Sequence, residues 1–352
     1  MIHTLRVLCL AVAANALCFA ADQAASAQAE RRITDATGRT IAVPARIERV
    51  YAAGPPASVL VFALAPDKLI GWTRAMRPDE AAFLPQRYAA LPELGRLTGR
   101  GNSANVEVVL RGNPDVIVDA GSTAPTFVSL AERVQAQTGI PYLLFDGRFD
   151  ATADTLRRLG ALLGDEASAR ALADYVERSL ADVKRRVAAV PAARQPRVYY
   201  ARGPNGLQTA AGGSINIEVL DFIGARNVAG DSSGGLINTS LEQVLAWNPE
   251  VIITTDPNFY AAVWKDARWS SVAAVRAKRV HLAPHLPFGW FDFPPGANRI
   301  IGLYWIARIL YPAEFPEDLR ARVTEFYRLF YHQEPAAARI DQLLGEPGVM
   351  PK

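Results

Sequence analysis

Two carboxylates occupy the same position in two similar stretches of the chain. The first stretch, NVEVVLRGNPDVIVD, begins at Asn105, and the second, SLEQVLAWNPEVIIT, begins at Ser240. Asn and Ser are good N-cap residues, so Glu107 and Glu242 fall in the first turn of a helix, where a negative charge meets the positive end of the helix dipole. A duplicated capped helix before a strand needs no function to exist, and this local explanation leaves the role of the two acids open.

Arg202 is the residue whose position most favours anion binding. It closes an apolar strand just before a Gly-Pro-Asn-Gly turn. A guanidinium there would bind a carboxylate, a hydroxamate oxygen or an oxoanion through two parallel hydrogen bonds. The alternative is an arginine that faces solvent or pairs with a local acid. Ser214 and Asn216 open the next predicted helix, whose N-terminal amides also suit an anion, although an ordinary N-cap explains Ser214 equally well.

Aromatic rings gather in the loop FGWFDF at 288–293. Such rings would pack on a large chelate or macrocycle, and Trp290 is the ring that we expect to face a ligand. The alternative is a loop anchored by buried rings. Tyr260 is a further candidate, for which helix packing beside Trp264 is the alternative.

The histidines do not form a convincing metal site. Pro284 lies between His281 and His285 and argues against one helical face, and His332 is the only other histidine beyond the N-terminal segment. A directly bound zinc or manganese ion usually requires several histidine and carboxylate ligands. We therefore expect neither a protein-ligated metal nor a cofactor.

Enzymatic motifs are weak in this chain. The phosphate loop GxxxxGK[ST], the metalloprotease motif HExxH and a GxGxxG after a strand do not occur. Sequence cannot pair two carboxylates across a cleft, so a secreted hydrolase acting on a metal chelate stays an alternative. We expect a protein that is not an enzyme and has no catalytic residues.

Charge and composition exclude some partners. The 352 residues carry 38 Lys and Arg against 35 Asp and Glu, a net charge of +3, and the basic residues form no run or stripe. A nucleic-acid partner is therefore not expected. The composition is half hydrophobic, and the length suffices for two domain-sized cores.

The first 29 residues are typical of a secretory signal peptide. Arg6 precedes the apolar run VLCLAVAANALCFAA, and small residues at 25–29 offer cleavage sites. An uncleaved anchor helix is the alternative, and Leu17 makes a poor lipoprotein box before Cys18. Both cysteines, Cys9 and Cys18, fall in this segment, so the mature protein would contain no thiol. We expect export to the periplasm.

Strands and helices alternate along the rest of the chain, which predicts an α/β fold with mostly parallel sheets. Predicted strands include Ile47–Ala52, DKLIGW, VIVDAG, PYLLFDG, RVYYARG, VIITTD and RVHLAP, and GSINIEVLDFIGA is a predicted helix. The stretch from about 165 to 190 has no Gly and one amphipathic face, so it predicts a long helix able to connect two domains. The repeated phrases lie 135 residues apart, a domain's length rather than a solenoid period. We expect a signal peptide at 1–29, an N-terminal lobe at 30–164, an interlobe helix at 165–190 and a C-terminal lobe with a helical tail at 191–352.

The mature chain resembles the periplasmic substrate-binding proteins of ABC importers, in the class that carries ferric siderophores, haem, cobalamin and some oxoanions. The predicted hairpin ITDATGRTIAVPARIERV, the phrases ending NPDVIV and NPEVII, and the single interlobe helix carry the resemblance. It implies a ligand cleft between the lobes, and Glu107 and Glu242 match the acids that form ion pairs with arginines of the permease. It also implies that these two acids, one on each lobe, fix the orientation in which the protein docks on a twofold permease dimer in the inner membrane.

The resemblance and the ends of the predicted strands together give the expected ligand contacts, since ligands of such sheets bind beyond the carboxyl ends of strands. The expected contacts are Pro55, Ser122, Thr123, Arg148, Tyr200, Arg202, Ser214, Asn216, Tyr260 and Trp290. We expect a monomer whose cargo is a chelated metal, a ferric siderophore or related iron complex, delivered to the permease for iron transport. Molybdate, tungstate, haem and cobalamin are the alternative cargoes.

Overall fold

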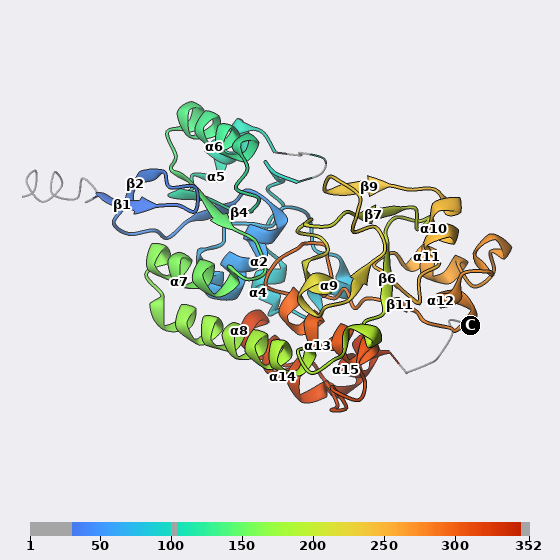
Figure 1. Ribbon diagram of the computed structural model, residues 1–352. Coiled ribbons are helices and arrows are strands. Elements are labelled where there is room, and N and C mark those ends of the chain that lie inside the picture. Colours follow the sequence, from blue (N-terminus) through green and yellow to red (C-terminus); the bar gives the residue numbers. More distant parts are fainter. Residues whose placement is uncertain (1–29, 100, 102–103, 346–352) are drawn as a thin grey trace, which may run out of the picture.

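Two parallel sheets form the centres of two halves of the chain in the computed structural model, which describes residues 30–99, 101 and 104–345 (Figure 1). The first sheet has the order β3-β4-β5, formed by Val50–Ala52, Val116–Gly121 and Tyr142–Asp146. The second has the order β11-β10-β6-β8, formed by Val280–Leu282, Val251–Thr254, Arg197–Ala201 and Arg226–Asn227. The predicted fold class, two α/β lobes with mostly parallel sheets, is confirmed. The predicted signal peptide lies outside the described residues.

Both faces of each sheet are buried, as expected for parallel strands covered by helices. In β4, Val116 and Val118 contact one core cluster, whereas Ile117 between them contacts another. In β10 the same alternation places Val251 in the cluster that also contains Val116 and Val118, and Ile252 in a cluster on the opposite face. Since the first of these clusters contains residues of both sheets, one continuous core joins the two halves.

Short antiparallel hairpins complete each half. Strands β1 (Glu30–Thr34) and β2 (Thr40–Pro44) pair in the first half, as the sequence predicted. The carboxylate of Asp35 at their turn accepts hydrogen bonds from Arg39 and from the Leu144 amide, and so ties the hairpin to β5. Strands β7 (Gln208–Ala210) and β9 (Leu236–Asn238) pair in the second half.

Helices cover the first sheet. Helix α2 begins with two prolines whose fixed φ suits the first turn, and it ends before Pro66. The helices of this half are α2 (Pro55–Leu64), α3 (Pro78–Ala81), α4 (Gln86–Ala89), α5 (Val106–Gly112), α6 (Pro125–Thr138) and α7 (Thr152–Leu163). A 3₁₀ turn, η1 (Pro66–Lys68), follows α2.

Helix α8 (Glu166–Val187) connects the halves and runs along the lower edge of the molecule in Figure 1. Its 22 residues span about 33 Å at 1.5 Å per residue. The Asp165 carboxylate caps it by accepting from the Ser168 amide, and its buried face includes Leu172, Val176 and Val183. The amphipathic pattern therefore gave this helix correctly.

Short helices cover the second sheet, and the chain ends in three longer segments. The helices are α9 (Glu218–Phe222), α10 (Leu241–Trp247), α11 (Pro257–Ala262), α12 (Ala273–Arg276), α13 (Arg299–Leu310), α14 (Arg320–Tyr331) and α15 (Ala337–Leu344), with 3₁₀ turns η2 (Ala192–Arg194) and η3 (Ala267–Trp269). Helix α14 packs on α2 of the first half, and His332 at its end hydrogen-bonds the Phe62 carbonyl at 3.0 Å. The tail thus adds a second connection between the halves.

Two predicted elements differ from the structure. DKLIGW is not a strand: it contains the end of η1 and makes only single bridges, Val50 with Leu69 and Trp72 with Glu93. The predicted helix GSINIEVLDFIGA is reduced to α9, which starts at Glu218 after a series of turns. Within the described ranges, no helix combines the length and apolar character needed to cross a membrane.

Candidate functional site

The two repeated phrases fold in the same way. Asn105 accepts a hydrogen bond from the Val108 amide at 3.1 Å, and Ser240 accepts one from the Gln243 amide at 3.2 Å. Each helix ends at an asparagine in the left-handed region, Asn113 with φ 43° and Asn248 with φ 42°. Asparagine tolerates this conformation better than most residues, so the sequence specifies both ends of each helix.

The acid that follows each Asn-Pro attaches the helix to the sheet. Asp115 accepts from the amides of Glu48 and Arg49, and Glu250 accepts from the amide of Arg197. The same arginines donate back to the helix ends, Arg49 to the Asn113 carbonyl and Arg197 to the Trp247 carbonyl. Sequence reasoning missed these arginines, whose reciprocal contacts hold α5 and α10 in equivalent positions on their sheets.

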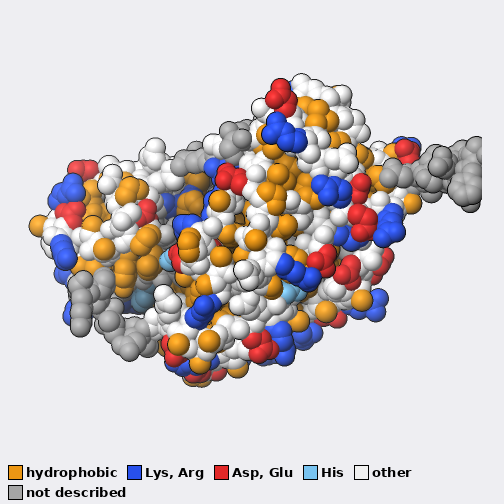
Figure 2. Space-filling model, turned by 180° about the vertical axis from the view of Figure 1, so that it is seen from behind, with side chains coloured by type: hydrophobic (Ala, Val, Ile, Leu, Met, Phe, Trp, Pro, Cys, Tyr) orange, Lys and Arg blue, Asp and Glu red, His pale blue; other side chains and the backbone are white. Residues whose placement is uncertain are grey.

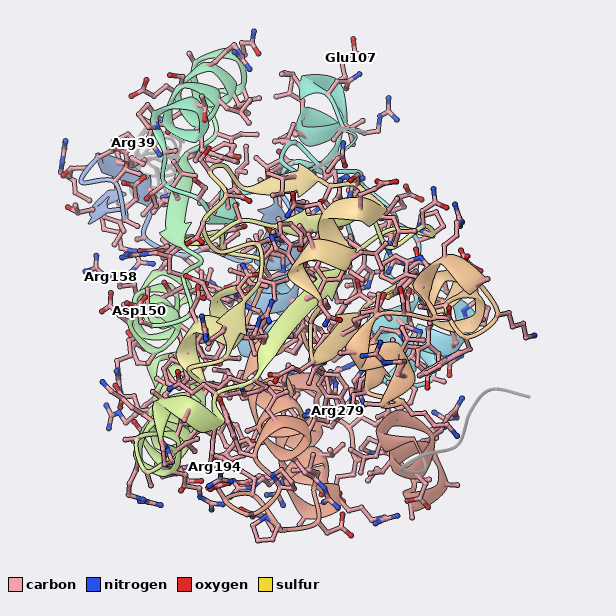
Figure 3. All side chains as sticks on the ribbon, turned by 45° about the vertical axis from the view of Figure 1, so that its right-hand side comes forward. Arg39, Glu107, Asp150, Arg158, Arg194 and Arg279 are labelled. Carbon is pink, nitrogen blue, oxygen red and sulfur yellow. The ribbon has the colours of Figure 1, made fainter. Side chains whose placement is uncertain are left out.

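The side chains of Glu107 and Glu242 are exposed. Hydrogen bonds from the helix start and from Ser240 lower the pKa of Glu242 below its ordinary value, so it is ionised at neutral pH. Figure 3 shows Glu107 pointing outward from the top of the molecule, far from Arg194 and Arg279 near its base. Each half therefore presents one carboxylate to solvent on an equivalent helix.

Arg202, immediately beyond the carboxyl end of β6, is buried with only 4% of its side chain exposed. Its Nη2 lies 3.4 Å from the Asp292 carboxylate, a long contact for an ion pair. Nε and Nη1 are buried and have no hydrogen-bond partner among the residues that the structure describes. Because buried donors are almost always satisfied in folded proteins, this guanidinium is unusual in keeping two N–H groups that an anion could accept from.

Asp292 organises the polar residues around Arg202, and sequence reasoning did not select it. Its carboxylate accepts from the Tyr200 hydroxyl at 2.9 Å and from Asn216 Nδ2 at 2.9 and 3.1 Å. It also accepts from the Phe293 amide at 2.8 Å. Burial raises the pKa of Tyr200 well above its ordinary value, so this hydroxyl stays protonated and donates. The structure thus brings the predicted residues Tyr200, Arg202 and Asn216 together around one acid.

The prediction that Ser214 and Asn216 begin a helix is wrong. Ser214 is buried, and its hydroxyl lies 3.2 Å from Asn216 Oδ1 in a turn that precedes α9 by several residues. No helix N-terminus therefore aims amides from this position. Asn216 contributes instead by holding Asp292 beside Arg202.

The aromatic loop faces the site through Phe293 rather than Trp290. Trp290 is fully buried and donates to the Tyr327 hydroxyl at 3.2 Å, so the prediction that it faces a ligand is wrong. Phe293 is 58% exposed, and its ring centroid lies 4.3 Å from the Arg202 guanidinium carbon. Its φ of 61° is rare for a bulky residue, and such strain concentrates at functional sites.

The other predicted contacts are spread over the ends of strands. Tyr260 is half-buried on α11 with its ring edge against Trp264, which is the packing alternative. In the first half Ser122 is exposed and Thr123 partly exposed after β4, and Pro55 is partly buried at the start of α2. Arg148 is exposed and forms an ion pair with Asp146 at 2.9 Å. No contact joins these four side chains to Arg202.

The loop that carries Phe293 also meets the first half. A Cβ placed on Gly296 would lie 3.8 Å from the Cα of Pro56 in α2, so the loop packs against the beginning of that helix. Arg202 and the positive end of the α2 dipole therefore flank the same loop. Figure 2 shows a hollow where the two halves meet, with basic side chains in it.

An ion pair between a fully buried arginine and a partly buried glutamate connects the halves near this loop. Arg299 at the start of α13 is fully buried and donates to Glu218 at 3.0 Å, to the Ile215 carbonyl and to the Gly147 carbonyl of the first half. Glu218 in turn accepts from the Phe149 amide of the first half at 3.1 Å. Burial raises the pKa of Glu218 and lowers that of Arg299, so the two ionised groups depend on each other.

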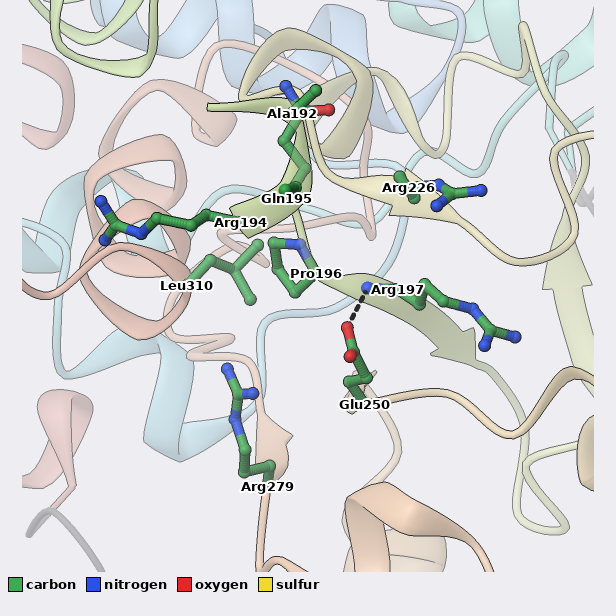
Figure 4. A pocket seen from close by; sticks show the side chains of 10 residues that line it. Ala192, Arg194, Gln195, Pro196, Arg197, Arg226, Glu250, Arg279 and Leu310 are labelled. Atoms are coloured by element: carbon green, nitrogen blue, oxygen red, sulfur yellow. Dashed lines mark hydrogen bonds between the residues drawn. The ribbon is translucent and has the colours of Figure 1, made fainter. Parts of the chain in front are cut away.

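A shallow pocket of about 300 Å³ lies at the opposite end of the second sheet (Figure 4). Arg197 and Arg226 begin β6 and β8 there, whereas Arg202 follows the other end of β6. In Figure 4 the Arg194 guanidinium points away from those of Arg197 and Arg226, so the positive groups do not converge. Across residues 30–345, apart from the gaps at 100, 102 and 103, no cluster of three His, Cys, Asp or Glu side chains could hold a metal ion.

The sequence contains the GxSxG pattern of serine hydrolases, but the structure does not place it between a strand and a helix. Residues 230–234 read Gly-Asp-Ser-Ser-Gly, which fits GxSxG. A nucleophile elbow joins a strand directly to a helix, but this segment consists of turns between β8 and β9.

Comparison with known proteins assigns the chain to a family. The model of the periplasmic binding protein family matches residues 61–285, and the chain belongs to this family. It is similar to an ABC transporter solute-binding protein of Sulfurospirillum deleyianum, with 32% identity and a TM-score of 0.82 over 89% of this chain and 98% of that one. The protein is accordingly a periplasmic solute-binding protein of an ABC importer.

Two further comparisons concern one relative. The molybdate-binding protein MolA of Haemophilus influenzae is 28% identical over 346 residues, covering 89% of this chain and 94% of the relative. The solved structure of MolA bound to molybdate has a TM-score of 0.73 at 22% identity, covering 87% of this chain and 99% of that chain. The latter likeness concerns the fold.

Proposed function

We propose that this protein captures a small tetrahedral oxoanion, molybdate or tungstate, and delivers it to an ABC permease. The observation that supports it most is the buried guanidinium of Arg202, whose Nε and Nη1 have no partner within the described part of the chain. An oxoanion would accept two parallel hydrogen bonds from such a group. Leaving buried donors unsatisfied costs about 1–3 kcal/mol each, and a bound anion removes that cost.

The surroundings of Arg202 support a small cargo. Asp292 already accepts hydrogen bonds from Tyr200, Asn216 and the Phe293 amide. It therefore holds the Arg202 guanidinium in place without accepting further hydrogen bonds from Arg202. Because Asp292 offsets much of the positive charge, a dianion needs a further attraction. The α2 dipole supplies it as a field rather than as amide donors, since Pro55 and Pro56 have no N–H.

An iron chelate, the cargo that the sequence resemblance favoured, has less support. A ferric siderophore is large and would need an open aromatic or basic platform. Trp290 lies in the core, and Arg202 is buried beside the exposed ring of Phe293, so the described residues offer no such platform there. The molybdate-binding relative, similar over most of both chains, also favours an oxoanion.

Calorimetry with matched variants tests the cargo. Purified protein is titrated with molybdate, tungstate, sulfate, a ferric hydroxamate and cobalamin. We expect molybdate and tungstate to bind, and Arg202→Met to weaken them at least about a hundredfold, as loss of a buried charged partner implies. Arg226→Met, an exposed arginine of the same half at the far end of the sheet, is the control. Binding of the ferric hydroxamate or cobalamin without molybdate would overturn the proposal.

Glu107 and Glu242 are proposed to dock the two halves on the permease. Their exposure and their equivalent positions on α5 and α10 support contact with a twofold partner. Uptake by cells carrying Glu107→Gln with Glu242→Gln should fall at least about tenfold while cargo affinity stays unchanged. Undiminished uptake in this double variant would remove the docking role.

A further inference from the structure

Large apolar side chains are exposed at three positions of the described residues: Leu110 at 48%, Leu245 at 37% and Phe293 at 58%. Phe293 lies against Arg202 at the proposed cargo site. The other two occupy the same position in the repeated phrases, three residues after Glu107 and Glu242. A single exposed leucine needs no explanation, but the same exposure on two equivalent helices does.

Each leucine lies on the same side of its helix as the acid. Residues three apart are neighbours on a helix surface, whereas the residue just before each leucine, Val109 or Val244, is completely buried. Each half therefore presents one carboxylate beside one isobutyl group. The capping asparagine or serine and the left-handed asparagine fix this small face in the same orientation relative to each sheet.

The neighbouring positions differ between the two helices. Exposed Arg111 corresponds to exposed Ala246, and half-buried Val108 corresponds to exposed Gln243. If the two phrases were alike only through common descent, there would be no reason for the acid and the leucine to stay alike while these neighbouring positions differ. The pairs that stay alike, Glu with Glu and Leu with Leu, are those that a twofold-symmetric partner would contact in the same way.

We infer that Leu110 and Leu245 are apolar anchors of the permease interface, each inserting beside the ion pair made by its neighbouring acid. This inference rests on the proposed docking role of Glu107 and Glu242. The occupant is the periplasmic face of the permease dimer, with a basic side chain next to an apolar recess in each subunit. Exposed ion pairs contribute little and are screened by salt, so they accelerate encounter more than they retain the complex. Burying the leucines excludes water from the ion pairs and slows dissociation.

Surface-plasmon kinetics with the permease complex in nanodiscs test the inference, with the cargo-loaded protein as analyte. We expect Leu110→Gln with Leu245→Gln to raise the dissociation rate about tenfold and to leave the association rate and cargo affinity unchanged. The double glutamate variant should instead slow association and flatten its salt dependence. Arg111→Gln with Gln243→Ala, exposed positions on the same helices, is the control.

The outcomes separate the two levels of the proposal. A dissociation rate within twofold of wild type for the leucine variant, or an equal effect of the control, would overturn the anchor role alone. If the glutamate variant also bound normally, the docking role itself would fail. A dimer of the wild-type protein in sedimentation that is lost in the leucine variant would assign the leucines to a second copy of this chain and would likewise overturn the inference.

Discussion

The Phe293 ring lies 4.3 Å from the buried guanidinium of Arg202 and is itself more than half exposed. The ring therefore separates the charge from water without burying itself. An aromatic face attracts a cation most strongly when the cation is desolvated, so Phe293 both shields and orients Arg202. The cargo would meet this edge of the molecule first.

Replacing Phe293 should lower oxoanion affinity while leaving the free energy of unfolding nearly unchanged. In Phe293→Gly the φ of 61° costs nothing, which offsets the lost ring contact, so the free energy of unfolding should stay within about 1 kcal/mol of wild type. Oxoanion affinity should fall about tenfold because water then reaches the guanidinium. Lys278→Gly, also at positive φ but remote from the site, is the control for urea denaturation and calorimetry. Undiminished affinity would contradict the shielding role.

The buried pair of Arg299 and Glu218 should dominate the connection between the halves. Glu218→Gln leaves the fully buried guanidinium without its counter-ion, and we expect a loss of about 3 kcal/mol in urea denaturation. Glu177→Gln removes the exposed partner of Arg157 and should cost less than about 1 kcal/mol. Equal effects of both substitutions would show that the buried pair adds nothing to the fold.

His281 should make the fold acid-sensitive. Burial, and secondarily the charge of Arg279, lower the pKa of His281 from 6.5 to about 4. The unfolded chain then takes up this proton near pH 6.5 and the folded chain only near pH 4, so the stabilisation is present above pH 6.5 and decreases as the pH falls through that window. At pH 5 the loss amounts to about 2 kcal/mol. The decrease in unfolding free energy between pH 7.5 and 5 should be smaller by about that amount in His281→Asn, and an identical decrease would refute the assignment.

Elements with strong periodicity could be predicted from the sequence. The apolar face of 165–190 gave α8, and the capped phrases gave α5 and α10 with their exposed acids. Strands such as β4 and β10 were recognisable because both faces are buried and the residues are almost all aliphatic. In these elements local sequence and tertiary contacts favour the same conformation.

The site was only half predictable because its contacts join distant segments. Tyr200 and Arg202 follow from the end of a strand, but Asp292 lies about 90 residues away and has no local pattern. The sequence did not reveal which ring of FGWFDF faces outward, since that depends on packing of Trp290 against Tyr327. Turns replaced the predicted helix at Ser214 because Asn216 hydrogen-bonds Asp292 rather than continuing a helix.

Anomalous diffraction from crystals soaked in tungstate would locate the bound oxoanion. We expect a tungsten peak within about 5 Å of Arg202 Cζ, as direct hydrogen bonds from Nε and Nη1 require, and no such peak in Arg202→Met. A tungsten peak confined to the shallow pocket beside Arg197 and Arg226, with none at Arg202, would contradict this expectation.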